Sequence, residues 1–65
     1  MTAKQFGRLI RKIRIKQKIT QPGLASTAKL PKSLLYEIET RGGNPSLVTL
    51  QKLATALRIT INIRP

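Results

Sequence analysis

Apolar side chains recur along this chain at two different spacings, and the spacing changes near its end. Phe6, Ile10 and Ile13 form one apolar stripe at the spacing of a helix. Ile15 lies on the far side of the same helix, where it is either a contact for a partner or a lone surface isoleucine. This pattern predicts a first helix over residues 4–18.

The segment QPGLASTAKLPKSLLYEI has the pattern of two short helices joined by a tight turn. Thr20 and Pro22 suit the start of the first, and the second is expected over residues 32–40. Two helices crossing at a steep angle need a small residue at their contact, and Ala25 supplies it. This spacing is typical of the helix-turn-helix, whose second helix enters the major groove of DNA. The buried positions are expected at Leu24, Ala25, Ala28, Leu30, Leu35 and Ile38.

A loop and a fourth helix follow. The loop RGGNP contains two glycines, which suit unusual backbone dihedrals, and a proline. Either Asn44 or Ser46 is expected to cap the helix that begins after it. The apolar stripe of that helix is expected to comprise Leu47, Leu50, Leu53, Ala54 and Leu57.

The last residues of the chain alternate between apolar and polar side chains. Ile59, Ile61 and Ile63 repeat with a period of two, which is typical of a half-buried strand. Because a lone strand exposes unpaired backbone groups, two copies are expected to pair there, with these isoleucines at the dimer interface. The alternative is a disordered tail. The predicted fold is all-α, with four helices in a domain over residues 1–58 and one short C-terminal β-strand for dimerisation over residues 59–65.

The charge of the chain narrows the classes of function. Lys and Arg number 13 against two acidic residues, which gives a formal net charge of +11. Such a chain favours polyanionic partners: nucleic acid, an anionic membrane or an acidic protein face. The chain lacks His, Cys and Asp, and Glu37 and Glu39 would point about 200° apart on a helix. We therefore expect no enzyme, no metal site and no cofactor.

Membrane insertion is not expected. Apolar runs are far shorter than the ~20 residues that span a bilayer, and no apolar segment follows the basic N-terminus. Together with the lack of cysteine, this predicts a cytoplasmic protein.

Several short motifs then indicate a family. Thr20-Gln21, Leu24-Ala25, Ile38-Glu39 and Asn44-Pro45-Ser46-Leu47 stand where the XRE family has its most specific residues. The chain resembles this family, the Cro/C1-type or phage-repressor type of helix-turn-helix, over about residues 6–58. The resemblance implies a four-helix bundle that binds double-stranded DNA as a homodimer and represses transcription from an inverted-repeat operator. One departure is Lys29, which stands where the family usually has Gly, and a left-handed backbone there costs ~1–2 kcal/mol.

Two further hypotheses about the function follow, an antitoxin and a membrane-binding or RNA-binding protein. A helical bundle followed by a strand is similar to the Hip-type antitoxins, which implies an autoregulating antitoxin with a kinase-like toxin as its partner. The basic first helix instead suggests a cationic membrane-binding or RNA-binding protein without specific operator recognition. The helix-turn-helix spacing and the apolar fourth helix favour the repressor, because both require a folded core.

The resemblance also implies roles for individual residues. The positions that read base edges in this family are held here by Lys32, Ser33 and Glu37. The side chain of Lys32 suits guanine, that of Ser33 suits several bases, and that of Glu37 suits cytosine N4. Arg14 and Glu39 correspond to an ion pair that holds the recognition helix, a structural and not a catalytic role. Contacts with phosphate are expected from Gln21, Lys29, Tyr36, Arg41, Gly43, Asn44 and Ser46.

Overall fold

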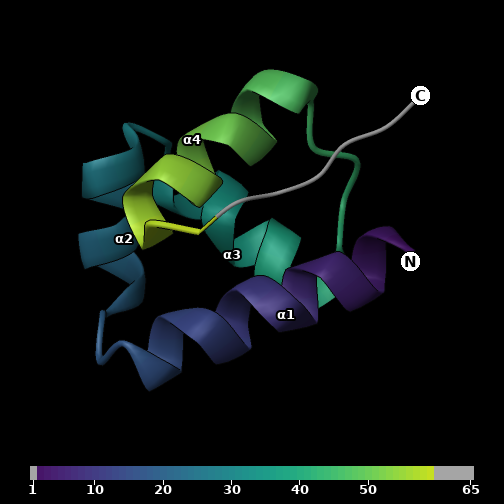
Figure 1. Cartoon of the computed structure of the whole chain (residues 1–65). Helices are drawn as coiled ribbons and strands as arrows, with labels where there is room; N and C mark the ends of the chain where they lie inside the picture. The colour runs from purple at the N-terminus through teal and green to yellow at the C-terminus, as the bar shows by residue number, and fades with distance from the viewer. Residues whose placement is uncertain (1, 60–65) are drawn as a thin grey trace.

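The computed structural model describes residues 2–59 of the chain, and these residues form a bundle of four helices (Figure 1). The helices are α1 (Ala3–Lys16), α2 (Gln21–Ala28), α3 (Lys32–Arg41) and α4 (Leu47–Leu57). Within that range, each helix falls short of the length and apolar character that crossing a bilayer demands.

A capping box at Thr2, which the sequence pattern did not reveal, starts α1. The Thr2 hydroxyl accepts a hydrogen bond from the Gln5 N–H at 3.1 Å, and the Gln5 side chain accepts one from the Thr2 N–H at 2.8 Å. The helix ends at Lys16, two residues before its predicted end, because Lys18 adopts a left-handed backbone with φ 59°. Ile10 is fully buried and Ile15 is half exposed, as the stripe predicted.

The turn between α2 and α3 is closed by Lys29. Its backbone is left-handed, with φ 57° and ψ 45°, as the departure from Gly at this position implied. The Leu30 N–H donates to the Ala25 carbonyl at 2.9 Å, so the last turn of α2 is satisfied despite the strained residue. At the other end of α2, the Thr20 hydroxyl accepts from the Gly23 N–H at 3.1 Å.

The core lies where the four helices meet. The predicted inward positions of the helix-turn-helix are buried, except that Leu30 is only half buried. In α4, Leu53 and Leu57 are buried, but Leu47 is 52% exposed. The prediction for Leu47 was wrong, because it is the first residue of α4, directly after the Ser46 cap. The fully buried large side chains are Ile10, Leu24, Leu35, Ile38, Leu53 and Leu57.

Two glycines allow α1 and α3 to approach closely. A Cβ built on Gly7 would overlap the Ile38 carbonyl oxygen, so the backbones of the two helices meet there without an intervening side chain. Gly42, with φ 81°, ends α3, and a Cβ there would lie 2.6 Å from the Cα of Lys4. The start of α1 therefore packs directly on the end of α3, which fixes how α3 is presented.

The strand predicted over residues 59–65 falls outside the described residues, apart from Ile59. The Ile59 N–H donates to the Ala54 carbonyl at 2.9 Å, and its side chain packs against the core of its own chain. Ile59 thus belongs to the turn that closes α4, which corrects its placement in the strand. Residues 2–59 contain no strand. The paired strands and the roles of Ile61 and Ile63 stay predictions.

Candidate nucleic-acid interface

One side of α3 is exposed and polar, and it carries the residues expected to read bases. Leu35 and Ile38 turn inward to the core, while Ser33 and Glu37 lie on the opposite side of the helix and are exposed. Lys32 is also exposed and is the first residue of α3. All three predicted base-reading residues therefore project from one helix, at or near its N-terminal half, as direct readout in a groove requires.

Tyr36 and Thr40 complete the same exposed side. Tyr36 is 56% exposed, so both its ring and its hydroxyl are accessible to a backbone phosphate. The Thr40 hydroxyl donates to the Tyr36 carbonyl at 2.7 Å and is therefore already used within the helix. The Tyr36 hydroxyl, unlike that of Thr40, makes no hydrogen bond within the helix and can therefore bind a partner.

The residues expected to hold phosphate lie beyond both edges of α3. In Figure 1 the beginning of α2 and the beginning of α4 lie on opposite sides of α3. Gln21 is the first residue of α2, and Ser46 caps α4 by accepting from the Thr49 N–H at 3.2 Å. Three other candidates, Lys29, Gly43 and Asn44, are exposed in the turns before and after α3. The last one, Arg41, is exposed at the C-terminal end of α3 itself. Helix N-termini favour anions, so this arrangement suits a duplex that straddles α3.

An ion pair ties the back of α3 to α1. The Arg14 Nε lies 2.9 Å from Glu39 Oε2, and the Arg14 Nη2 lies 3.0 Å from Glu39 Oε1, which makes the pair bidentate. The Glu39 side chain is only 1% exposed and the Arg14 side chain 11%. The remaining Arg14 Nη1 donates to the Ile19 carbonyl at 2.8 Å. With its hydrogen bonds made, the pair fixes α3 against α1.

Gln21 joins this ion pair, which the sequence did not predict. Its Nε2 donates to Glu39 Oε1 at 3.3 Å, so the first residue of α2 is linked to the buried end of α3. The contact depends on the packing of α2 against α3, and no local sequence signal announces it. Gln21 is half buried, and its side-chain amide is held by Glu39 while its backbone lies at the helix N-terminus.

The charged side chains on the exposed side of α3 are all positive, apart from Glu37. The chain has two carboxylate side chains, and Glu39 is buried in its ion pair, which leaves Glu37 as the exposed one. The Glu37 Cγ lies 4.0 Å from where a Cβ of Gly43 would stand, so its side chain runs toward the loop before α4. A lone carboxylate in a cationic surface opposes general attraction to phosphate and suits a discriminating contact with a base donor.

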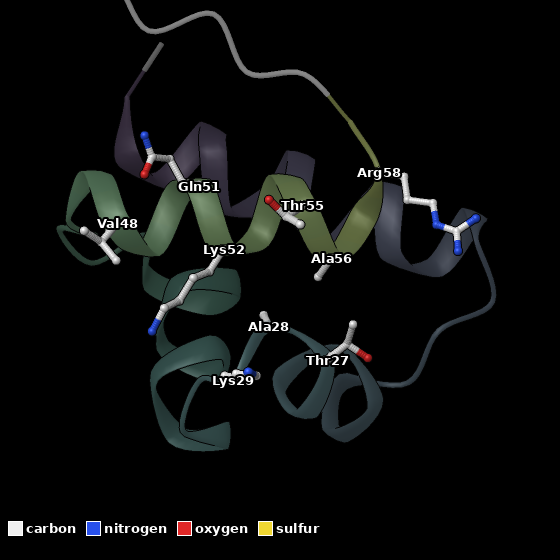
Figure 2. A pocket seen from close by; sticks show the side chains of 9 residues that line it. All are labelled: Thr27, Ala28, Lys29, Val48, Gln51, Lys52, Thr55, Ala56 and Arg58. Atoms are coloured by element: carbon white, nitrogen blue, oxygen red, sulfur yellow. The ribbon is translucent and has the colours of Figure 1, made fainter.

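A groove of about 570 Å³ lies between α2 and α4, outside the exposed side of α3 (Figure 2). In Figure 2, Ala28 and Ala56 face each other across it, and their small side chains leave the space open. Lys29 and Lys52 also line the groove. Lys29, a predicted phosphate contact, is thus shared between this groove and the turn that leads into α3.

Comparison with known proteins agrees with this geometry. Residues 10–63 match the protein family described as Helix-turn-helix (HTH_3). An immunity repressor protein of Bacillus phage phi105 is 45% identical over 56 residues, which cover 86% of this chain and 39% of that protein. This chain therefore spans about two fifths of the repressor's length.

A solved structure is similar over nearly the whole fold. The restriction-modification controller protein C.AhdI from Aeromonas hydrophila superposes with a TM-score of 0.85 and 36% sequence identity. The match covers 89% of this chain and 88% of the controller protein. The four-helix arrangement, the helix-turn-helix and both relatives lead to one assignment: this chain belongs to the XRE-type helix-turn-helix family.

Proposed function

We propose that this chain is a DNA-binding transcriptional repressor, not an enzyme, that acts as a homodimer on an inverted-repeat operator. The observation that carries the proposal is the exposed side of α3, where Lys32, Ser33 and Glu37 project away from the core. The charge of +11 supplies attraction to the duplex, and the Arg14–Glu39 pair holds α3 in place. The similarity to an immunity repressor and a controller protein supports a regulatory role.

In this proposal, contacts divide into those that read bases and those that only hold the duplex. Lys32 donates to guanine O6 or N7, Ser33 bonds to a neighbouring base, and Glu37 accepts from cytosine N4. Phosphates lie at the beginnings of α2 and α4, against Gln21 and Ser46. The flanking phosphate contacts come from Lys29, Tyr36, Arg41, Gly43 and Asn44.

Replacing Lys32 with alanine tests the base-reading role. We expect the variant to lose ~1–3 kcal/mol of binding free energy on the preferred duplex and to relax preference at one base position. Fluorescence anisotropy against a panel of single-base variants of that duplex measures both effects. The matched control is Arg41→Ala, which removes a predicted phosphate contact and should weaken all duplexes alike. Equal weakening of every sequence by Lys32→Ala would make Lys32 a phosphate contact instead.

The dimer is proposed to form through the C-terminal residues. The alternation of Ile61 and Ile63 with polar residues supports a strand that pairs with its copy, because the pairing satisfies the backbone groups of both. We expect deletion of residues 60–65 to give a monomer with weak operator binding. The deletion retains Ile59, which closes α4, so the four-helix core is kept. Sedimentation of the truncated chain as a dimer would place the interface elsewhere.

An antitoxin role is the more specific form of this proposal. It rests on the similarity between a strand-ended repressor and the Hip-type antitoxins, and it implies a kinase-like toxin as a second partner. Co-expression with the product of the neighbouring gene, followed by size-exclusion chromatography, tests it. Co-elution supports the antitoxin role, and separate elution of the two proteins leaves a plain repressor.

A further inference from the structure

The outer side of α1 is strongly basic and takes no part in the proposed DNA contact. Arg8, Lys12 and Lys16 follow each other at intervals of four residues, so they form one row along the helix, and all three are exposed. Ile15 lies beside this row on one side and is 50% exposed, and Leu9 lies beside it on the other and is 39% exposed. We call these five residues the outer face of α1.

This face points away from α3. At about 100° per residue, Lys12 lies about 140° around the helix from Gly7 and Lys16 about 180°, while Arg8 lies about 100° around, at the flank. Gly7 is the point where α1 touches the α3 backbone at Ile38, and on α3 Ser33 lies about 140° around from Ile38. Lys12 and Lys16 are therefore on the side of the packed helix pair opposite to Ser33, and Arg8 is at its flank.

The distance between the two sides separates them electrostatically. The domain measures 30 × 22 × 20 Å along its principal axes, so opposite sides of it are more than two Debye lengths apart at physiological ionic strength, where one Debye length is ~8 Å. A duplex bound on α3 thus leaves the cations of the outer face unpaired. α1 itself contains no acidic residue that could pair with them.

The row has no evident benefit for the fold. Like charges four residues apart destabilise a helix, and this applies to Arg8 with Lys12 and to Lys12 with Lys16. Lys16 has a favourable place in the last turn, near the negative end of the helix dipole, but Arg8 and Lys12 are too far from that end. An anionic partner bound to these three cations would relieve the repulsion between them.

We propose that the outer face of α1 is a docking surface for an acidic protein segment that also carries apolar side chains. Carboxylates of the segment pair with Arg8, Lys12 and Lys16, and its apolar side chains cover Ile15 and Leu9. The exposed apolar side chains of Ile15 and Leu9 favour a protein over a second nucleic acid, because a phosphate backbone offers no apolar partner to such side chains. The proposal goes beyond operator binding and allows DNA and the acidic segment to be held at once.

The test uses the full chain and a fluorescein-labelled synthetic peptide rich in Glu and Leu, titrated at physiological ionic strength. The variant Arg8→Gln/Lys12→Gln/Lys16→Gln is expected to bind the peptide about tenfold more weakly, as the loss of three exposed ion pairs implies. Its duplex affinity should keep the salt dependence of the unchanged chain. The matched control, Lys29→Gln/Lys32→Gln/Arg41→Gln, has the same net charge but should keep peptide affinity and lose duplex affinity. Circular dichroism checks that both variants are folded.

Three outcomes would overturn the proposal. If both triple variants weaken peptide binding equally, the peptide senses net charge alone. A salt slope for duplex binding that falls by ~0.9 per charge removed from α1 would assign the outer face to DNA. Displacement of the peptide by saturating duplex would place both ligands on one surface. Because the peptide titration needs no DNA, failure of the proposed repressor function would appear in the duplex titration alone.

Discussion

Glu39→Ala is expected to lower the free energy of unfolding by about 3–5 kcal/mol, because it leaves the partly buried Arg14 without its carboxylate partner. A domain of this size has only about 3–10 kcal/mol of stability in total, so the loss removes a large part of it and the variant should unfold at a much lower temperature. Chemical denaturation followed by circular dichroism measures the change. The matched control is Glu37→Ala, which removes the exposed carboxylate two residues earlier in α3 and should change stability by less than about 0.5 kcal/mol.

A second variant separates the charge from the packing. Arg14→Met/Glu39→Leu removes both ions and fills the site with apolar side chains, and its stability should lie close to that of the unchanged chain or above it. Under this account the pair holds α3 in one orientation, so the double variant should fold but discriminate less between DNA sequences. If Glu39→Ala proves as mild as Glu37→Ala, the ion pair does not hold α3 to α1.

Gly7→Ala is the second large effect that we expect. A Cβ at Gly7 would overlap the Ile38 carbonyl oxygen and lie 2.9 Å from its carbonyl carbon. Both atoms belong to the backbone and cannot rotate away, so α1 and α3 must separate. We expect a loss of about 3 kcal/mol, which exceeds the gain of ~0.5–1 kcal/mol from replacing a helical glycine with alanine.

Gly23→Ala provides the control for this change, because Gly23 is also a helical glycine. A Cβ there would meet the Thr20 side-chain oxygen at 3.0 Å, a flexible group, and no backbone atom of another helix. Its helix-propensity gain and the crowding of the Thr20 cap oppose each other, so the net change should stay within about 1 kcal/mol. Thermal unfolding of the two variants side by side measures the contrast. Equal stability of both would show that α1 and α3 tolerate a side chain between them.

The parts of the fold that follow from periodicity were predictable. The stripe that contains Ile10, the inward residues of the helix-turn-helix and the apolar positions Leu53 and Leu57 each follow from local spacing. They are buried, except that Phe6, Ile13 and Leu30 are partly buried. The left-handed backbone of Lys29 was also foreseen, but from the family resemblance, because the family usually has Gly at this position.

Other features needed the packed structure. Lys18 and Arg58 adopt left-handed backbones at the ends of α1 and α4 without the glycine that would announce such a turn. The contact of Gly7 with Ile38 depends on how two helices cross, and the bond from Gln21 to Glu39 depends on how α2 sits on α3. The spacing of residues along one sequence does not predict either of these two contacts. The residues expected to touch DNA are exposed where the proposal needs them, except that Gln21 is half buried, but exposure does not distinguish base contact from phosphate contact.

Selection of preferred sites from a randomised pool of duplex DNA tests the central claim most directly. The full chain is mixed with the pool at physiological ionic strength, and the bound duplexes are sequenced. A homodimer that reads bases through α3 predicts enrichment of an inverted repeat whose half-site centres lie ~34 Å apart, or a multiple of that distance. Recovery of duplexes without any enriched sequence would contradict the account and leave a basic domain that binds DNA through its charge alone.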